Sequence, residues 1–112
     1  MLKSSVLLIS LIPFFSYSEE QMINVLSDKD AHYFILDKNI KDGHSDIILR
    51  VERDGNSTYY HKSYDCVKNE VVTYGSGKTI SSIQENGTVI QSTMIVPSSV
   101  DDFVMNAACI KN

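Results

Sequence analysis

Between residues 32 and 96, short runs of β-branched and aromatic residues alternate with tight-turn signals, and this pattern restricts the fold more than any other feature of the sequence. Asp42-Gly43, Asp54-Gly55-Asn56 and Asn86-Gly87 are turn sequences, because aspartate, asparagine and glycine tolerate the positive φ that a tight reversal requires. Turns this short favour an antiparallel meander, since a parallel sheet needs long crossover connections. The sequence therefore predicts one antiparallel sheet of about six strands.

Side-chain alternation predicts where these strands lie. In residues 46–53, Ile47, Leu49 and Val51 fall on one face, as in a half-buried strand. We expect strands over 22–28, 32–37, 46–53, 57–66, 70–74, 78–85 and 88–96, with a short helix as the alternative for the first. A polar turn is expected over 38–45. The stretch GSGKT (75–79) lacks the first glycine of a phosphate-binding loop, so we interpret it as a glycine-rich turn.

The last segment of the chain has the period of a helix. Pro97 ends the preceding strand because it cannot donate to a strand ladder. Ser98 fits an N-cap, with Asp101 three residues later, and both Asp101 and Asp102 suit the positive end of the helix dipole. One apolar stripe follows, formed by Val100, Phe103, Val104, Ala107 and Ala108. The prediction is an α+β domain in which one C-terminal helix packs on a face of the sheet.

The N-terminal segment predicts export. Residues 1–18 combine a positive Lys3, an apolar run from Val6 to Phe15 and a small-x-small cleavage signal at Ser16-Tyr17-Ser18. Because a transmembrane helix needs about 20 apolar residues, this run is too short for one. Cleavage near Ser18 leaves residues 19–112 as a single domain, expected in the periplasm or secreted, without membrane insertion.

The charge balance of the exported part disfavours two classes of partner. Without Lys3, nine basic and fourteen acidic residues remain, a net charge of −5 with neutral histidines. Nucleic acids and anionic membranes bind basic patches. We therefore expect neither as the main partner.

Two cysteines, Cys66 and Cys109, remain after cleavage. Because an exported chain meets an oxidising compartment, a disulfide between them is expected, with two free thiols or an intermolecular bond as the alternatives. Such a bond joins the end of a strand to the end of the helix. In the chain-entropy model it contributes about 4 kcal/mol.

No residue set indicates catalysis or cofactor binding. The three histidines, His32, His44 and His61, lie in different segments without metal-ligand spacing. Serine occurs in no nucleophile motif. We expect a protein that is not an enzyme and has no cofactor or metal.

One strand carries a candidate interaction face. Tyr59, His61, Ser63 and Asp65 alternate on the side opposite Tyr60, Tyr64 and Cys66. If the helix covers the tyrosine-and-cysteine side, the first row faces solvent. Exposed aromatic and polar residues suit protein recognition, and an ordinary solvated strand is the alternative.

Several segments, in order, resemble the surface-adhesin protein E family of small exported bacterial domains. They are YFILDKNIKDG (33–43), YDC (64–66) and IVPSSVDDFVMNAAC (95–109). The resemblance implies an antiparallel sheet with a C-terminal helix tethered by a disulfide, and adhesion to host matrix glycoproteins. The chain departs from the pattern because it has no lipoprotein cysteine and no matching cluster of exposed basic or aromatic residues.

The functional hypothesis is an exported, non-enzymatic protein-binding module, adhesin-like, with a host matrix protein as partner. The alternative is a periplasmic inhibitor or immunity protein that neutralises a hydrolase or toxin. The acidic balance favours this alternative where the target enzyme is basic. The oligomeric state stays open.

Overall fold

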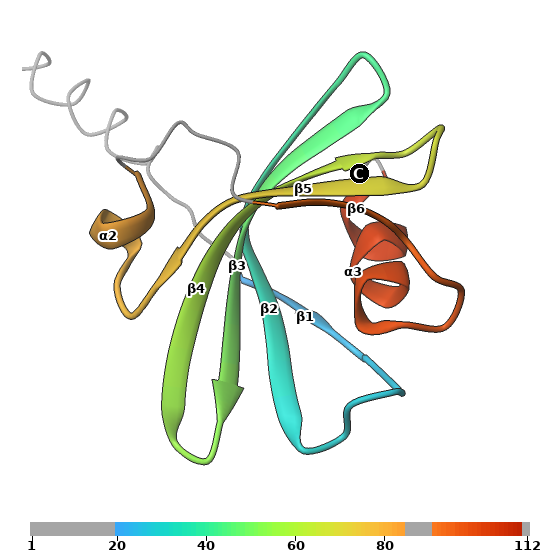
Figure 1. The fold of residues 1–112 in the computed structure, drawn as a ribbon. Coiled ribbons are helices and arrows are strands. Elements are labelled where there is room, and N and C mark those ends of the chain that lie inside the picture. Colours follow the sequence, from blue (N-terminus) through green and yellow to red (C-terminus); the bar gives the residue numbers. More distant parts are fainter. Residues whose placement is uncertain (1–19, 85–90, 111–112) are drawn as a thin grey trace, which may run out of the picture.

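The computed structural model describes residues 20–84 and 91–110, in which six antiparallel strands form one strongly twisted sheet with a helix on either side (Figure 1). The strands are β1 (Gln21–Ile23), β2 (Ala31–Lys41), β3 (His44–Arg53), β4 (Asn56–Asp65), β5 (Glu70–Gly77) and β6 (Gln91–Met94), and the helices are α2 (Ile80–Gln84) and α3 (Val100–Ala108). Each strand pairs with the next one along the chain. This confirms the predicted α+β class and the antiparallel meander. The predicted signal peptide, residues 1–18, lies outside the described residues.

Two tight turns connect the long central strands. Asp42 and Gly43 have φ of 52° and 79°, and Asp54 and Gly55 have φ of 54° and 81°. Both pairs therefore make the two-residue reversal that the sequence indicates. The polar turn predicted over 38–45 is wrong in its extent, because a two-residue turn lets β2 continue as a paired strand up to Lys41.

The core lies on one face of the sheet, called here the α3 face. Ile47 and Leu49 of β3 are each 1% exposed, which confirms the alternation predicted for this strand. Further apolar side chains of the core come from the other central strands and from α3, among them Ile35, Tyr64, Val71, Val104 and Ala108. Burial of these side chains is what holds the helix on the sheet.

Helix α3 begins one residue later than predicted. Its N-cap is Ser99, whose Oγ accepts a hydrogen bond from Asp102 N at 3.3 Å. Ser98 has a φ of 67°, and its backbone N–H donates to Asp102 Oδ2 at 2.8 Å. Asp102 therefore fills the capping position that the sequence assigned to Asp101. Asp101 is left free to bind the sheet.

Hydrogen bonds hold both ends of α3. At its first turn, Asp101 Oδ1 accepts a hydrogen bond from Tyr64 OH at 2.8 Å. At its last turn, Ala108 O accepts one from Ser45 Oγ at 2.7 Å, and Lys38 Nζ donates to Ala107 O at 3.2 Å. These partners come from β4, β3 and β2 respectively, so the helix lies across the strands.

A disulfide joins Cys66 to Cys109, as predicted. Cys66 follows β4 directly, and Cys109 is the C-cap of α3. Cys66 N also donates to Gly43 O at 2.8 Å, which ties the β2–β3 turn to the same point. The bond therefore fixes the C-terminal end of the helix to the end of the sheet where the β2–β3 and β4–β5 turns lie.

Residues 75–85 differ most from the prediction. Gly75 and Gly77 continue β5, and residues 80–84 form α2 where a strand was expected. A Cβ on Gly75 would lie 3.3 Å from Ile83 O, and one on Gly77 would lie 2.0 Å from Ser82 Oγ. The glycines therefore allow α2 to approach the sheet, instead of making a turn.

The first strand of the hairpin predicted around Asn86-Gly87 is wrong, because α2 occupies residues 80–84. The predicted turn lies outside the described residues. β6 pairs with β5, from Glu70 opposite Met94 to Thr73 opposite Gln91. At the other edge, β1 consists of Gln21, Met22 and Ile23, so it covers only two of the residues predicted as a strand over 22–28.

Candidate functional site

Helix α3 leaves part of the α3 face open. The helix lies across the strands, so it covers a width of about 10–12 Å along them, whereas the ten residues of β3 extend over about 33 Å. It lies over the end of the sheet that holds Ser45. The opposite end, toward the β3–β4 turn, contains a pocket of about 420 Å³.

We call this hollow the tyrosine pocket. It is lined by Tyr33, Leu49, Val51, Arg53, Tyr60 and Val100, and by four polar residues, Asp54, Asn56, Thr58 and Lys62. Leu49 and Val51 lie on the same face of β3 and form the apolar floor of the pocket, with Leu49 1% exposed and Val51 half-buried. Val100, the first residue of α3, bounds the pocket on the helix side.

Tyr33 and Tyr60 lie on the strands that flank β3. Tyr33 is opposite Val51 in the β2–β3 register, and Tyr60 is opposite Leu49 in the β3–β4 register. Tyr33 is 5% exposed, while Tyr60 is half-buried and has more surface available to a ligand. The two phenol rings therefore border an apolar strip of β3.

An ion pair holds one side of the pocket. Tyr33 OH donates to Asp28 Oδ2 at 2.7 Å, and Arg53 donates to the same carboxylate through both terminal nitrogens, one of them 3.2 Å from Asp28 Oδ1. The Arg53 guanidinium and the Tyr33 hydroxyl lower the pKa of Asp28 from 3.8 to about 2. Burial and the same carboxylate raise the pKa of Tyr33 above its ordinary value. Both groups therefore keep their charge states at neutral pH.

A second ion pair lies on the other side. Lys62 Nζ donates to Asp101 Oδ1 at 3.0 Å and lies 5.2 Å from the centre of the Tyr60 ring. The Lys62 side chain is 14% exposed. The aliphatic part of Lys62 therefore packs beside the pocket while its ammonium group is bound to α3.

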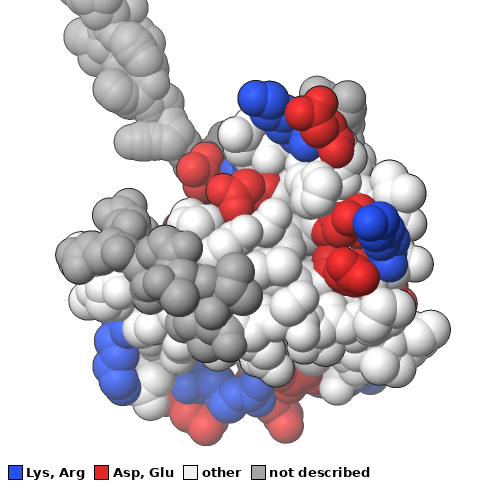
Figure 2. Space-filling model, turned by 45° about the horizontal axis from the view of Figure 1, so that its top comes forward, with Lys and Arg blue, Asp and Glu red and all other residues white. Residues whose placement is uncertain are grey.

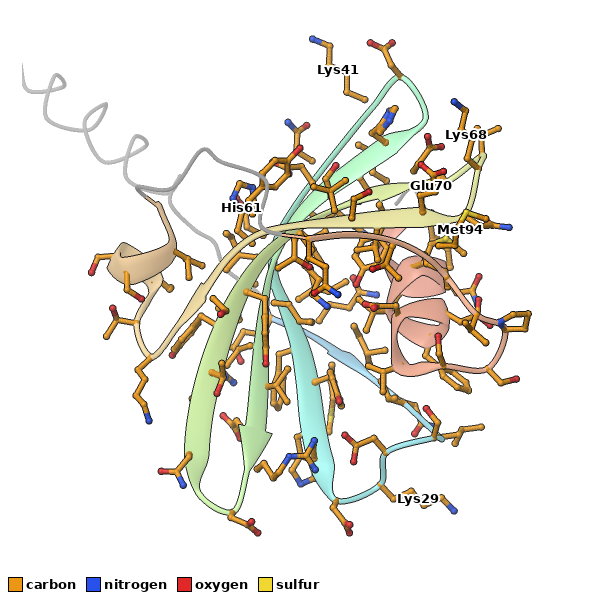
Figure 3. The ribbon with its side chains drawn as sticks, in the orientation of Figure 1. Lys29, Lys41, His61, Lys68, Glu70 and Met94 are labelled. Atoms are coloured by element: carbon orange, nitrogen blue, oxygen red, sulfur yellow. A yellow bond between two sulfur atoms is a disulfide. The ribbon has the colours of Figure 1, made fainter. Side chains whose placement is uncertain are left out.

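The predicted interaction row lies on the opposite face. Tyr59, His61, Ser63 and Asp65 do alternate with Tyr60 and Tyr64, but each of the four is half-buried. Figure 3 shows His61 on the side of the sheet away from α3. The row and the tyrosine pocket are therefore two separate surfaces.

Contacts within the chain occupy two residues of that row. His61 Nε2 lies 3.1 Å from Asp46 Oδ1, and its ring centre is 5.0 Å from that of Tyr74. Asp65 Oδ1 accepts hydrogen bonds from the backbone of Val67 and of Lys68, both at 3.0 Å. These backbone amides hold the pKa of Asp65 below its usual range. Asp65 therefore stabilises the β4–β5 turn.

The β1–β2 loop contains another hollow, of about 450 Å³, lined among others by Met22 and Leu26. Its walls depend on β1, an edge strand of three residues. The tyrosine pocket is built on β3, which is paired along both edges. It is therefore the better organised of the two before any ligand arrives.

Charged side chains do not form a patch of one sign on the face seen in Figure 2, where acidic and basic residues lie beside one another around a mainly uncharged surface. Within residues 20–84 and 91–110, no three histidine, cysteine, aspartate or glutamate side chains are close enough to hold a metal ion. In the same part of the chain, no helix has the length and apolar character to cross a membrane.

Sequence reasoning missed the tyrosine pocket. The alternation in β4 places Tyr60 on the helix side, where it was expected to be covered. The signal that could have located the pocket is the difference between the width of a single helix, about 10–12 Å, and the length of a ten-residue strand. Asp28, which binds both Tyr33 and Arg53, comes from a loop whose position no local pattern predicts.

Comparison of the chain with family models, with curated proteins and with solved structures gives no match. The resemblance to the surface-adhesin protein E family therefore stays a prediction.

Proposed function

We propose that this chain is an exported, non-enzymatic protein-binding module, adhesin-like, and that the tyrosine pocket is where its partner binds. The observation that supports this is the combination, in one concave site, of Tyr33, Tyr60 and Arg53 around the apolar strip of β3. Tyrosine and arginine are enriched among the residues that contribute most to protein–protein binding energy. Concave, largely preformed sites are also where proteins bind ligands.

The size of the pocket suits one anchoring side chain of a larger partner. A stable protein interface buries about 800 Å² on each side, and the pocket, with its ten lining residues, forms only part of such a surface. The β3–β4 turn with Asp54 and the start of α3 with Val100 surround the pocket and offer further contact area. The proposed interface therefore has the pocket at its centre and these two elements at its rim.

Rigidity of the site favours affinity. β3 is hydrogen-bonded to strands on both sides, and the disulfide and hydrogen bonds described above hold α3 in place. Little conformational freedom is then lost when a partner binds, and less of the contact energy is needed to offset that loss.

The second candidate function is a periplasmic inhibitor or immunity protein. Its support is the net charge of the chain, −4 including Lys3, together with the exposed Asp54 at the pocket. An acidic protein associates faster with a basic target enzyme than with an acidic one.

Export is part of the proposal. A disulfide such as Cys66–Cys109 persists in oxidising compartments and is rare in the cytosol, which supports the periplasmic or secreted location expected from residues 1–18. The expected mature N-terminus is at or within two residues of Glu19. N-terminal sequencing of the protein from its own cells measures this, and an intact Met1 would contradict the export proposal.

The binding experiment uses the mature chain, residues 19–112, as bait against purified host matrix glycoproteins and against hydrolases and toxins secreted by the same cells. Two variants supply the control. Thr58→Trp places an indole in the pocket, while Ser57→Trp places one at the neighbouring position on the other face of β4.

We expect the wild type and Ser57→Trp to capture the same partner, and Thr58→Trp to capture at least tenfold less. The class of the captured protein separates the adhesin from the inhibitor function. Equal capture by both variants, or no capture from either set of proteins, contradicts the proposal.

A further inference from the structure

We infer that the tyrosine pocket binds an uncharged aromatic side chain of the partner, with a phenol or indole tip. This inference depends on the proposed function, because it names the chemical group that the same site accepts. Three properties of the pocket support this inference. Its two cations are paired with carboxylates, its two tyrosine rings flank the strip of β3, and it has polar side chains that can bind a ligand.

The charges of the pocket disfavour a charged ligand. Arg53 is bound to Asp28 through both terminal nitrogens, and Lys62 is bound to Asp101 at 3.0 Å. An incoming anion has to compete with these two carboxylates of the same chain. An incoming cation meets the like charges of Arg53 and Lys62, and the exposed Asp54 is the one carboxylate among the lining residues that could attract it. A neutral group leaves both ion pairs intact and avoids the cost of removing a charge from water.

The rings and the strand spacing favour a flat group. Tyr33 and Tyr60 lie on β2 and β4, which are two strand spacings apart, about 10 Å. Carbon atoms in contact lie about 3.5–4.0 Å apart, so a ring that lies on Val51 can also contact Tyr60, both of which are half-buried, while Leu49 and Tyr33, 1% and 5% exposed, form the closed floor and one wall. Aromatic pairs gain from offset or edge-to-face contacts in addition to the burial of their area.

Two side chains provide hydrogen-bonding groups for the tip of such a ring. Thr58 and Asn56, which line the pocket from β4, carry a hydroxyl and an amide. Either can accept a hydrogen bond from a phenol O–H or an indole N–H. This pattern, an apolar ring with one polar atom, is that of tyrosine and tryptophan.

The test is a titration of the isotope-labelled mature chain followed by amide NMR shifts. The probes are p-cresol and 3-methylindole, which represent the two aromatic side chains. Acetate and n-butylammonium serve as matched anionic and cationic probes. We expect saturable shifts for the aromatic probes at amides of residues 49–53 and 58–62. The charged probes should bind there at least tenfold more weakly.

The same variants control for the site. Thr58→Trp should weaken binding of p-cresol at least tenfold, and Ser57→Trp should leave it unchanged. Where Thr58→Trp does not give a folded spectrum, Asn56→Ala replaces it, because Asn56 is exposed at the start of β4. In that variant, p-cresol should bind about threefold more weakly. Binding of toluene, which has no hydroxyl, should stay unchanged, as expected for the loss of one hydrogen bond.

Tighter binding of acetate or n-butylammonium at the pocket, or aromatic shifts that persist in Thr58→Trp, overturns the inference. Pocket-dependent capture of a protein without any binding of the aromatic probes overturns the inference and leaves the proposed function standing. Binding of the aromatic probes without capture of any protein overturns the proposed function and leaves the chemistry of the pocket standing.

Discussion

Replacement of Asp101 by alanine should destabilise the protein far more than replacement of its neighbour Asp102. Both carboxylates lie in the first turn of α3, so both variants lose a similar favourable contact with the helix dipole. Only Asp101 binds the sheet, where it accepts hydrogen bonds from Tyr64 OH at 2.8 Å and from Lys62 Nζ at 3.0 Å. The difference between the variants therefore measures the attachment of the helix to the sheet.

The magnitude follows from what each variant leaves behind. Tyr64 is 0% exposed, and the free energy cost of a buried hydroxyl without a partner is about 1–3 kcal/mol. Lys62, with a side chain 14% exposed, also loses its carboxylate. We expect Asp101→Ala to cost about 2–4 kcal/mol. Asp102→Ala loses an exposed bond to Ser98 N and should cost about 1 kcal/mol or less.

Urea denaturation of the oxidised protein at pH 7, followed by circular dichroism, measures both variants. The slope of the free energy of unfolding against urea concentration should stay constant, so that the change in midpoint reports stability. Tyr64→Phe completes a double-mutant cycle, because it removes the hydroxyl that Asp101→Ala leaves unpaired. Its combination with Asp101→Ala should cost less than the sum of the single changes by about 1 kcal/mol or more.

Equal costs for the two aspartate variants would refute this reasoning, since the bonds of Asp101 to β4 would then contribute nothing. Strict additivity of Tyr64→Phe and Asp101→Ala would refute the role of the tyrosine hydroxyl, even with a large cost for Asp101→Ala.

Three further predictions concern other parts of the structure. Cys109→Ser should lower the free energy of unfolding by about 2–5 kcal/mol, measured by urea denaturation. Thiols that react in the native wild type, before denaturant is added, would contradict the Cys66–Cys109 bond. Phe103→Ala should lower the free energy of unfolding by about 2 kcal/mol, because this side chain is half-buried and truncation of a fully buried phenylalanine costs more. A cost above about 4 kcal/mol would contradict that placement. The pKa of Asp28, lowered to about 2, means that its contribution to stability is present above pH 4 and is lost as the pH falls toward 2. Asp28→Asn should therefore flatten the stability curve in that window, and an unchanged curve would show that the bond to Arg53 does not form.

Several features were predictable from the sequence because local residue pairs determine them. Asp42-Gly43 and Asp54-Gly55 can adopt positive φ at adjacent positions, and this is what a two-residue hairpin turn requires. Side-chain alternation then places Ile47 and Leu49 in the core. The disulfide followed from the presence of two cysteines in a chain expected to be exported.

The errors lie where a distant segment decides the local structure. Gly75 and Gly77 have the composition of a turn, but they serve as a contact surface for α2 and stay in the strand. Residues 78–85 were expected to form a strand, yet Ile80 and Ile83 are spaced three apart, as on one face of a helix. Thr79 stabilises the helix start by accepting a hydrogen bond from Ser82 N at 3.2 Å. The helix is preferred because Ile83 becomes fully buried against the sheet.

The sequence by itself determined the order of the central strands and the position of α3 within a residue, because turns and periodicity are local properties; for the cysteines it determined that only one intramolecular pairing was possible. Only the tertiary structure decided which part of the sheet α3 covers. That depends on Asp101 meeting Tyr64 and on Ala108 meeting Ser45, contacts between residues 37 and 63 positions apart. The tyrosine pocket exists because a short helix held at those points cannot reach the far end of β3, and no local pattern encodes the space that remains.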